Sequence, residues 1–345
     1  MSAFVSSGRI TSVRPLWAIE GGRVTLHGAG FPVDPVLPQV RVGSQPARLA
    51  QASPTELSVV IPSGIDGGST AIRIDELPGE TAYIDVAAPF VTGVHQVDSP
   101  AFDRHGNLYV TFSGSRGQRA PVAIFRVRPD GTREPFVTDV PNPTSLAFDG
   151  DGRLYVSSRF DGSVHQIEAD GRATLYASDL GVACGLAFSS DGALFVGDRS
   201  GTILRIDETG RARAFATVPP SVAAFHLAFG PDDCLYVAAP TLGPNDVVYR
   251  ILPSGRASVC CSGFGRPQGL AFDAAGHLYV VDALAGGSGV YRVRLDAPDD
   301  PELVLAGGAV IGIAFDPHGG VAIATADTVY RLNVTLRGIL PLSSQ

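Results

Sequence analysis

The sequence predicts an all-β protein, and three observations support this fold class. A phrase of two short apolar runs around a turn rich in Asp and Gly, such as LAFDGDGRLYV, occurs six times along the 345-residue chain. The phenylalanines of these phrases are separated by 46, 40, 41, 43 and 43 residues, a near-constant period that indicates structural repeats. Glycine and proline, with 41 and 26 residues, recur too often for helices of ordinary length. The six phenylalanines are Phe102, Phe148, Phe188, Phe229, Phe272 and Phe315.

The first 87 residues lack the repeat. Short alternating apolar and polar runs between Gly and Pro turns, such as VRVGSQPARL and TELSVVIPSG, imply a small antiparallel sandwich. A more specific likeness is carried by Ile10, Pro15, Gly21-Gly22, the hairpin Gly28-x-Gly30-Phe31, Val42-Gly43 and Ile61-Pro62. With these residues the segment resembles the IPT/TIG domain, an immunoglobulin-like module. The resemblance implies an immunoglobulin-like β-sandwich over residues 1–87 that acts as a spacer or contacts a protein.

Each repeat is typical of four strands. The run that ends at Phe148 is almost wholly apolar, which indicates a strand buried on both faces. An Asp-x-x-Gly turn leads to the second strand, Leu154–Val156, and Ser163–Ile167 and Thr174–Ala177 supply the third and fourth. Four strands in about 40–45 residues form one propeller blade. We therefore expect a six-bladed β-propeller of four-stranded blades over residues 88–345, with blades that begin near residues 98, 144, 184, 225, 268 and 311.

The segment before the first repeat predicts how the ring closes. PFVTGVHQVDSPAF, residues 89–102, closely matches PFVTDVPNPTSLAF, residues 135–148, in which an outer strand precedes a blade. We expect Phe90–Thr92 to complete the last blade from the N-terminal side. Gly338–Leu342 is the competing segment.

Composition excludes several partners. The net charge is −8 and the arginines are scattered, so we expect no nucleic acid and no membrane as partner. No apolar run approaches the roughly 18 residues that a membrane span requires. The N-terminus lacks the basic and apolar regions of a signal peptide, which predicts a cytoplasmic protein. If a leader was removed, the protein is extracytoplasmic instead.

Lysine is absent, which excludes Schiff-base chemistry and a phosphate-binding lysine and is typical of a GC-rich bacterial genome. The four cysteines, Cys184, Cys234, Cys260 and Cys261, lack zinc-site spacing. We expect free and mostly buried thiols.

A propeller concentrates binding at one end of its axis. The loops that enter each innermost strand and those between the second and third strands share this axial face, whereas the Asp-x-x-Gly turns lie on the opposite face, where they act as turn formers. The axial positions before the innermost strands are Asp98-Ser99, Thr144-Ser145, Cys184-Gly185, Phe225-His226, Gln268-Gly269 and Ile311-Gly312. We predict ligand binding by Thr144, Ser145, Arg159, Asp198, Arg199, Gln268 and Asp282.

Three axial residues are candidates for catalysis: Asp98, His226 and Cys184. Asp98 and His226 would form an acid–base pair if they meet across the channel. Cys184 and His226, on adjacent blades, would form a thiolate–imidazole pair. The alternative is that each is an isolated polar residue satisfied by backbone groups or water.

The six phrases approximate the pattern x-G-L-A-F-D-x-x-G-x-L-Y-V, from which the sixth departs with Ala322 at the aromatic position. With this pattern, residues 89–345 resemble NHL-repeat and gluconolactonase/regucalcin-type propellers. The lactonase branch implies a divalent cation, often calcium, held by Glu, Asn and Asp at the channel mouth. Asp98, Cys184 and Phe225 stand at these positions. Because a hard cation prefers several oxygen ligands, we predict no cofactor, and Asp98 is a metal ligand only if a calcium-type site persists.

These observations favour a non-catalytic binding or scaffold protein. Its axial face would bind a small ligand or a protein, and its N-terminal domain could contact a protein. The alternatives are a lactone or ester hydrolase with an altered metal site and a propeller lyase with a histidine base such as His226. Whether the protein is an enzyme stays open at this point.

Overall fold

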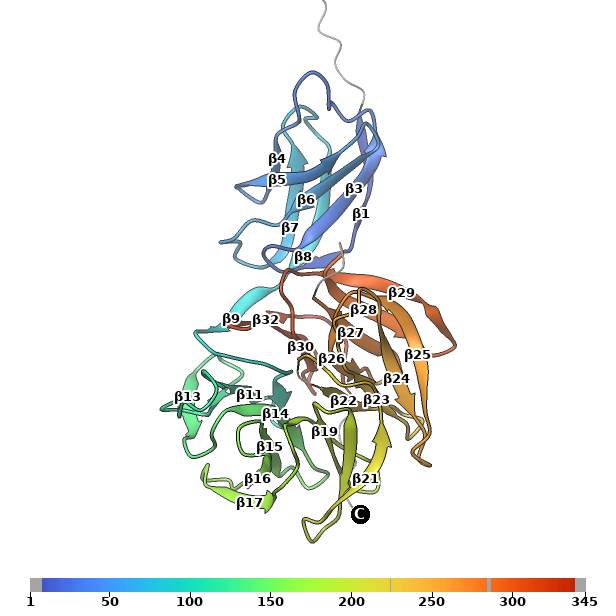
Figure 1. The fold of residues 1–345 in the computed structure, drawn as a ribbon. Coiled ribbons are helices and arrows are strands. Elements are labelled where there is room, and N and C mark those ends of the chain that lie inside the picture. The colour runs from blue at the N-terminus through green and yellow to red at the C-terminus, as the bar shows by residue number, and fades with distance from the viewer. Residues whose placement is uncertain (1–7, 224, 284–286, 339–345) are drawn as a thin grey trace, which may run out of the picture.

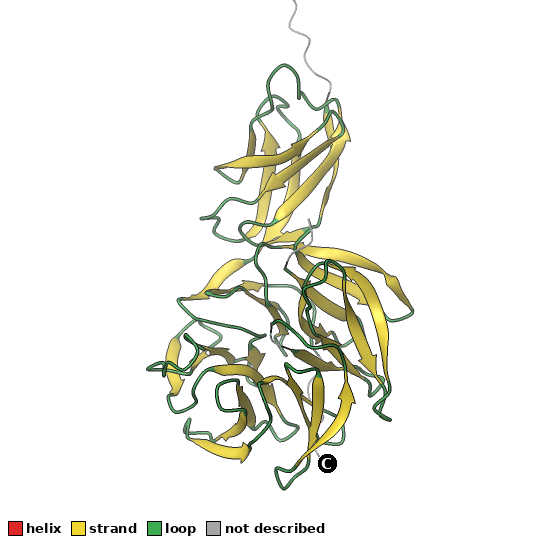
Figure 2. Cartoon of the chain, in the orientation of Figure 1, coloured by secondary structure: helices red, strands yellow, loops and turns green. Residues whose placement is uncertain are grey.

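The computed structural model describes residues 8–223, 225–283 and 287–338, and all regular elements in these ranges are strands (Figure 2). A small sandwich sits on one edge of a larger ring of sheets (Figure 1). The predicted all-β class is therefore confirmed. No helix in the described ranges has the length and apolarity needed to cross a bilayer.

The sandwich packs two layers of antiparallel strands. One layer has the order β1-β3-β6-β5, and β4, β7 and β8 continue from β5 into the other. The core between the layers includes Leu26, Leu57, Ile72 and Ile84, each almost fully buried. The strands are β1 (Arg9–Arg14), β2 (Trp17–Ala18), β3 (Arg23–Ala29), β4 (Val40–Val42), β5 (Gln45–Ala52), β6 (Glu56–Val60), β7 (Gly68–Ile74) and β8 (Thr81–Val86).

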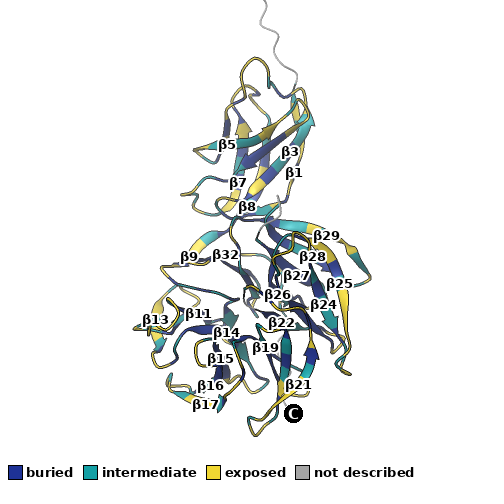
Figure 3. Ribbon diagram, viewed as in Figure 1, coloured by how far each residue is buried: buried dark blue, intermediate teal, exposed yellow. Residues whose placement is uncertain are grey.

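Four repeats form separate four-stranded antiparallel sheets in sequence order. The first sheet comprises β10 (Ala101–Phe102), β11 (Leu108–Thr111), β12 (Ile124–Val127) and β13 (Arg133–Val137), and the second β14 (Pro143–Phe148), β15 (Leu154–Ser158), β16 (Ser163–Ile167) and β17 (Ala173–Ala177). The third comprises β18 (Ala183–Phe188), β19 (Leu194–Asp198), β20 (Thr202–Ile206) and β21 (Ala212–Thr217), and the fourth β22 (His226–Phe229), β23 (Leu235–Ala238), β24 (Asp246–Ile251) and β25 (Ala257–Phe264). Buried residues follow the inner strands, and exposed residues gather on outer strands such as β21 and β25 (Figure 3).

A fifth separate sheet closes the ring. It comprises β30 (Gly312–Phe315), β31 (Val321–Ala324), β32 (Thr328–Leu332) and, from the other end of the repeat region, β9 (Ala88–Thr92). β9 pairs antiparallel with β32, with Thr92 opposite Thr328 and Val91 opposite Val329. The prediction that the N-terminal strand completes the last blade is confirmed. Of the competing segment, Gly338 bridges to Asp273 instead, and residues 339–342 lie outside the described residues.

The strands of the remaining repeat belong to a larger sheet. β26 (Pro267–Phe272), β27 (Leu278–Asp282), β28 (Gly289–Arg294) and β29 (Ala297–Ala306) pair antiparallel in the order of a blade, and β26 contacts β22 and β30. However, β2 runs parallel to both β29 and β8, so these strands and the sandwich form one 12-stranded sheet. Our prediction of six separate blades is corrected: five four-stranded blades stand apart, because the outer edge of β29 is not free but hydrogen bonded to the N-terminal domain.

An aromatic contact explains the most regular feature of the repeat. In five of the six repeats, the phenylalanine that ends the inner strand packs edge-to-face on the aromatic ring of the second strand in the preceding repeat; Phe102 is the exception, since Ala322 stands at the aromatic position of the last repeat. The ring centroids are 5.0–5.3 Å apart in Tyr109–Phe148, Tyr155–Phe188, Phe195–Phe229, Tyr236–Phe272 and Tyr279–Phe315. Such pairs contribute about 0.5–1.5 kcal/mol beyond area burial. The two residues recur because they form the interface between neighbouring blades.

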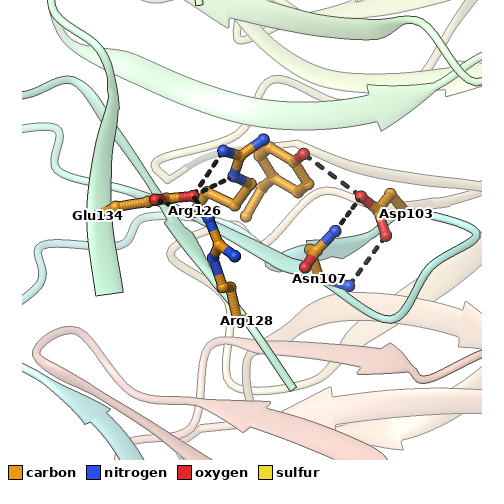
Figure 4. A network of polar contacts seen from close by, with 6 residues as sticks. Asp103, Asn107, Arg126, Arg128 and Glu134 are labelled. Carbon is orange, nitrogen blue, oxygen red and sulfur yellow. Dashed lines mark hydrogen bonds and ion pairs between the residues drawn. The ribbon is translucent and has the colours of Figure 1, made fainter. Parts of the chain in front are cut away.

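The Asp-x-x-Gly turns are held by their own carboxylates. Asp103 Oδ1 accepts hydrogen bonds from the backbone N–H groups of His105 and Asn107 at 2.8 and 2.9 Å, and Gly106 supplies the left-handed φ of 80°. Figure 4 shows this carboxylate beside the ion pair of Arg126 with Glu134. Asp149 and Asp273 make the same two backbone contacts in their turns. The interpretation of these aspartates as turn formers is confirmed.

Replacement of Phe195 by alanine tests the aromatic interface. Phe195 is 5 % exposed and packs on Phe215 and Phe229, so Phe195→Ala is expected to lower the free energy of unfolding by about 3–5 kcal/mol. Urea denaturation measures the change. Leu175→Ala on the outer strand β17, where the side chain is 59 % exposed, serves as control and should change stability by less than about 0.5 kcal/mol. Equal losses in the two variants would contradict the proposed interface.

Candidate functional site

The innermost strands begin close together around the axis. The backbone N–H of Gly269 donates to the carbonyl of Ile311, and the N–H of Ile313 donates to Ser99 Oγ. Between the second and third repeats, the N–H of Leu186 donates to Ser145 Oγ. The approach is so close that a Cβ on Gly185 would lie 2.6 Å from the carbonyl oxygen of Phe225. The ring is therefore narrow at the level where the predicted site residues lie.

Asp98 and His226 meet across this narrow ring. Asp98 precedes β10 of the first repeat and His226 opens β22 of the fourth, yet Asp98 Oδ1 lies 2.5 Å from His226 Nδ1. Both side chains are buried, at 6 % and 1 % exposure. The N–H of Ser99 donates to the same carboxylate oxygen at 2.6 Å. His226 Nε2 is buried and has no hydrogen-bond partner among the described residues. The pair joins the first and fourth repeats across the ring.

Cys184 is buried beside the pair without joining it. Desolvation by burial is the main cause that raises the pKa of its thiol to about 11, and Arg199 and Arg159 oppose that shift only in part. Because His226 Nδ1 bonds Asp98 and its Nε2 has no partner, no hydrogen bond joins Cys184 to His226 in the described structure. A protonated thiol at neutral pH is a poor nucleophile. The structure therefore brings together one of the two predicted pairs.

Most of the predicted ligand-binding residues hold the loops of the axial face. Thr144 Oγ1 donates to the carbonyl of Asn142, and Ser145 accepts the N–H of Leu186. The carboxylate of Asp198 accepts the N–H of Val182 at 2.8 Å. Asp282 accepts those of Gly265 and Arg266 at 3.0 and 2.7 Å and is fully buried. Gln268 is buried as well. The side chains of Thr144, Ser145, Asp198 and Asp282 thus already bond to the backbone, so few of their hydrogen-bonding atoms remain for a ligand.

Arg159 and Arg199 behave differently. They directly follow β15 and β19, at equivalent positions of adjacent blades, and both are half-buried. Arg199 donates to the carbonyl of Val222 at 2.9 Å, and Arg159 reaches the carbonyl of Gly114 at 3.4 Å. Neither forms an ion pair with a described carboxylate, and the Nε of each is buried without a hydrogen-bond partner in the described ranges.

The positive charges lie close enough to repel one another. Burial is the main cause that lowers the pKa of Arg159, and the charges of Arg199 and Arg116 lower it further. Burial followed by the charge of Arg159 lowers the pKa of His95. The sequence showed scattered arginines, and the propeller gathers Arg116, Arg159 and Arg199 because their loops are equivalent in successive repeats. That equivalence was visible in the repeat alignment and is the signal that would have found the cluster.

Exposed apolar side chains lie on the loop of Arg159 and on two further loops of the fourth repeat. Phe160 follows Arg159 and is 51 % exposed, and Val222, whose carbonyl accepts from Arg199, is 39 % exposed. Leu242, in the loop between β23 and β24, is 90 % exposed. The loops of Val222 and Leu242 are tied together, since the N–H of Val222 donates to the carbonyl of Pro240. Sequence reasoning did not single out these three residues.

The residues at the lactonase metal positions do not fit a calcium ion. The Asp98 carboxylate bonds His226 and Ser99, the Cys184 thiol has a raised pKa, and Phe225 has no ligand atom in its side chain. Within the described ranges, no group of three or more His, Cys, Asp or Glu side chains has an arrangement that could hold a metal ion. Calcium prefers six to eight oxygen ligands, and this set offers too few.

The IPT/TIG domain family matches residues 9–76. The match confirms the resemblance of the N-terminal segment to that domain. No curated protein matches the chain.

Three solved structures illustrate the fold likeness. A gluconolactonase from Xanthomonas campestris has 18% identity and a TM-score of 0.60, and the match covers 88% of this chain and 99% of that one. Virginiamycin B lyase from Staphylococcus aureus has 14% identity and a TM-score of 0.54, over 73% and 97%. An auxiliary nutrient binding protein from Bacteroides ovatus has 15% identity and a TM-score of 0.52, over 94% and 97%. At these identities the likeness shows a shared propeller fold alone.

Removal of one partner tests the buried pair. Asp98→Leu leaves His226 Nδ1 unpaired, and His226→Leu leaves the carboxylate without its imidazole, so each variant is expected to lose about 3–5 kcal/mol of unfolding free energy. The double variant should lose less than the sum of the two, which a double-mutant cycle in urea measures. Asp139→Ala, which breaks an exposed pair with Arg119, is the control and should cost about 0–1 kcal/mol. Additive single losses would contradict the pairing.

The four thiols should differ sharply in reactivity. Cys260 is partly exposed, and a hydrogen bond with Cys261 lowers its pKa, whereas burial raises the pKa of Cys184 to about 11. We expect an aromatic disulfide reagent at pH 7.5 to modify one thiol rapidly. Cys260→Ser should abolish this fast phase and Cys184→Ser should leave it unchanged. A fast phase lost in Cys184→Ser would show that Cys184 is an accessible thiolate.

Proposed function

We propose that the protein is a non-catalytic binding protein that takes its ligand on the axial face of the propeller. One observation carries the proposal. The candidate catalytic side chains are buried, and two of them bond each other, whereas arginines on the axial loops keep N–H donors that no group of the described residues accepts. Asp98 and His226 bond each other, and the Cys184 thiol is protonated at neutral pH. Arg159 and Arg199 retain unpaired N–H groups beside exposed apolar side chains.

The fold likeness includes binding proteins. The Bacteroides ovatus auxiliary nutrient binding protein is matched over nearly its whole length by nearly the whole of this chain, and a second protein of that description from Bacteroides thetaiotaomicron is matched over 95% and 98%. Those matches include the N-terminal sandwich as well as the propeller. A streptogramin B lyase is matched over 96% of this chain and 95% of its own length, so the extent of the match does not separate a binding protein from a lyase. A binding role accounts for both parts of the molecule.

We further propose that β26–β29 act as the sixth blade, since their strand order and the position of β26 between β22 and β30 are those of a blade. In this arrangement the N-terminal sandwich is an extension of that blade. The sandwich then sets the distance between the axial face and any protein that it contacts.

A second candidate is a lyase in which His226 acts as the base. The specific observation in its favour is the buried contact of His226 Nδ1 with Asp98, which leaves Nε2 unbonded. A carboxylate that fixes one imidazole nitrogen so that the other can take a proton is a common arrangement in catalysis. Against it stands the burial of Nε2, which a substrate would reach only if the axial loops opened. The hydrolase alternative is weaker, because the metal ligands do not fit.

Binding and turnover measured together test the proposal. The purified full chain is screened for compounds that raise its melting temperature. In parallel it is assayed for hydrolysis of lactones and aryl esters, with calcium and with a chelator, and for lyase turnover of virginiamycin B and quinupristin. We expect ligands that stabilise the protein in a concentration-dependent way and no turnover. Turnover lost in His226→Gln would establish the lyase candidate, and calcium-dependent hydrolysis lost in Asp98→Asn would establish a hydrolase.

A further inference from the structure

Three arginines on the axial face have no carboxylate partner among the described residues. Each nearby carboxylate accepts from other donors: Asp98 from His226 and Ser99, Asp282 from two backbone N–H groups, and Asp198 from Val182 and Ser200. Asp161 accepts from Ser163. None of these contacts involves a guanidinium. Arg116, Arg159 and Arg199 therefore have no ion pair with a carboxylate among the described residues.

An unpaired Nε alone would not indicate a site. Arg331 also has a buried Nε without a partner, but its guanidinium donates to Asp316 at 2.6 Å. Arg119, in the same loop as Arg116, pairs with Asp139. Arg266 shares with Arg159 and Arg199 a buried Nε without a partner and the lack of an ion pair among the described residues. Arg159 and Arg199 each make one backbone contact, although a guanidinium carries five N–H donors. The geometry leaves several donors of two neighbouring guanidinium groups for something outside the chain.

Like charges held at close range require a reason. Burial and the neighbouring charges of Arg199 and Arg116 disfavour the charged form of Arg159, yet arginine stays protonated at neutral pH. Repulsion and desolvation both act against the fold at this place. A negatively charged ligand between the guanidinium groups would remove the repulsion and supply the missing acceptors. Carboxylate and phosphate groups match the planar guanidinium with two parallel hydrogen bonds.

The apolar residues define the rest of the ligand. Phe160 stands next to Arg159 in the chain, and Val222 is bonded through its carbonyl to Arg199, so each arginine has an exposed apolar neighbour. Leu242 extends this apolar surface from the adjacent loop. A fully inorganic anion would leave these side chains in water, whereas an anion with an apolar body would bury them. The net charge of −8 makes nucleic acid an unsuitable occupant.

We infer that the axial face binds a small organic anion, with its carboxylate or phosphate group between Arg159 and Arg199 and its apolar part against Phe160, Val222 and Leu242. This inference rests on the proposed binding function and names the chemical class of its ligand. Arg116 adds long-range attraction, and His95 lies at the edge of the same charge cluster.

Calorimetry with small probes on the full-length protein tests the inference. The probes are phenyl phosphate and phenylacetate, with inorganic phosphate and the neutral phenylacetamide as comparisons. We expect the two organic anions to bind, inorganic phosphate to bind more weakly, and phenylacetamide to bind at least about tenfold more weakly than phenylacetate, since it lacks the charge-assisted hydrogen bonds. Higher salt should weaken binding of the anions.

Variants locate the binding group. Arg159→Gln and Arg199→Gln are each expected to weaken phenyl phosphate binding at least about tenfold, the loss expected for a charge-assisted hydrogen bond. Arg119→Gln is the matched control, because it removes a charge from the same face that is already paired with Asp139, and it should change affinity less than about twofold. Melting temperatures confirm that each variant is folded, and Arg159→Lys tests whether the planar fork is needed.

The outcomes separate this inference from the proposed function. Equal loss in Arg119→Gln and Arg159→Gln, or no binding of any anion probe up to millimolar concentration, overturns the anion site. If neutral compounds bind and Arg159→Gln has no effect on their affinity, the anion site is also overturned, but the proposed binding function stands. Chemical conversion of a probe that depends on His226 overturns the binding function itself.

Discussion

The pairing of β9 with β32 is the interaction on which the rest of the molecule depends. Every blade buries both faces against its neighbours, so an open ring would expose the faces of the first and last repeats. β9 closes the ring by binding the two ends of the repeat region together, with Val91 opposite Val329. The residues that follow β9 then lead inward and place Asp98 beside His226, halfway around the ring. Closure thus determines both the core of the propeller and the centre of its axis.

The same strand also orients the N-terminal sandwich. β8 ends at Val86 and β9 begins at Ala88, which leaves almost no linker between the two parts. β2 adds a second connection by pairing with β8 and β29, and Tyr330 donates a hydrogen bond to Glu20 at 2.6 Å. A Cβ on Gly22 would lie 2.3 Å from the carbonyl oxygen of Ala306, so this contact requires glycine. The sandwich is therefore held to the propeller by backbone pairing as well as by side chains.

Local pattern predicted the fold because the repeat encodes its own interfaces. The phenylalanine and the aromatic seven residues later contact equivalent residues of adjacent blades, so their spacing in sequence carries the packing. The matching phrases at residues 89–102 and 135–148 predicted the closing strand for the same reason. The 12-stranded sheet was not predictable in this way, because β2 is a two-residue strand whose partners lie far away in the chain. At the site, pattern placed Asp98 and His226 on the axial face, but only the closed ring brings them within 2.5 Å.

Ring geometry also bears on the proposed binding site at the rim of the axial face. Glycines at the starts of the inner strands, such as Gly185 and Gly269, let these strands approach until backbone atoms touch. The Asp98–His226 pair and Cys184 lie buried near this centre. The loops farther out are free of this constraint, and they carry Arg159 and Arg199 at equivalent positions of successive blades. A narrow, buried centre and a charged, apolar rim are two consequences of the same close packing.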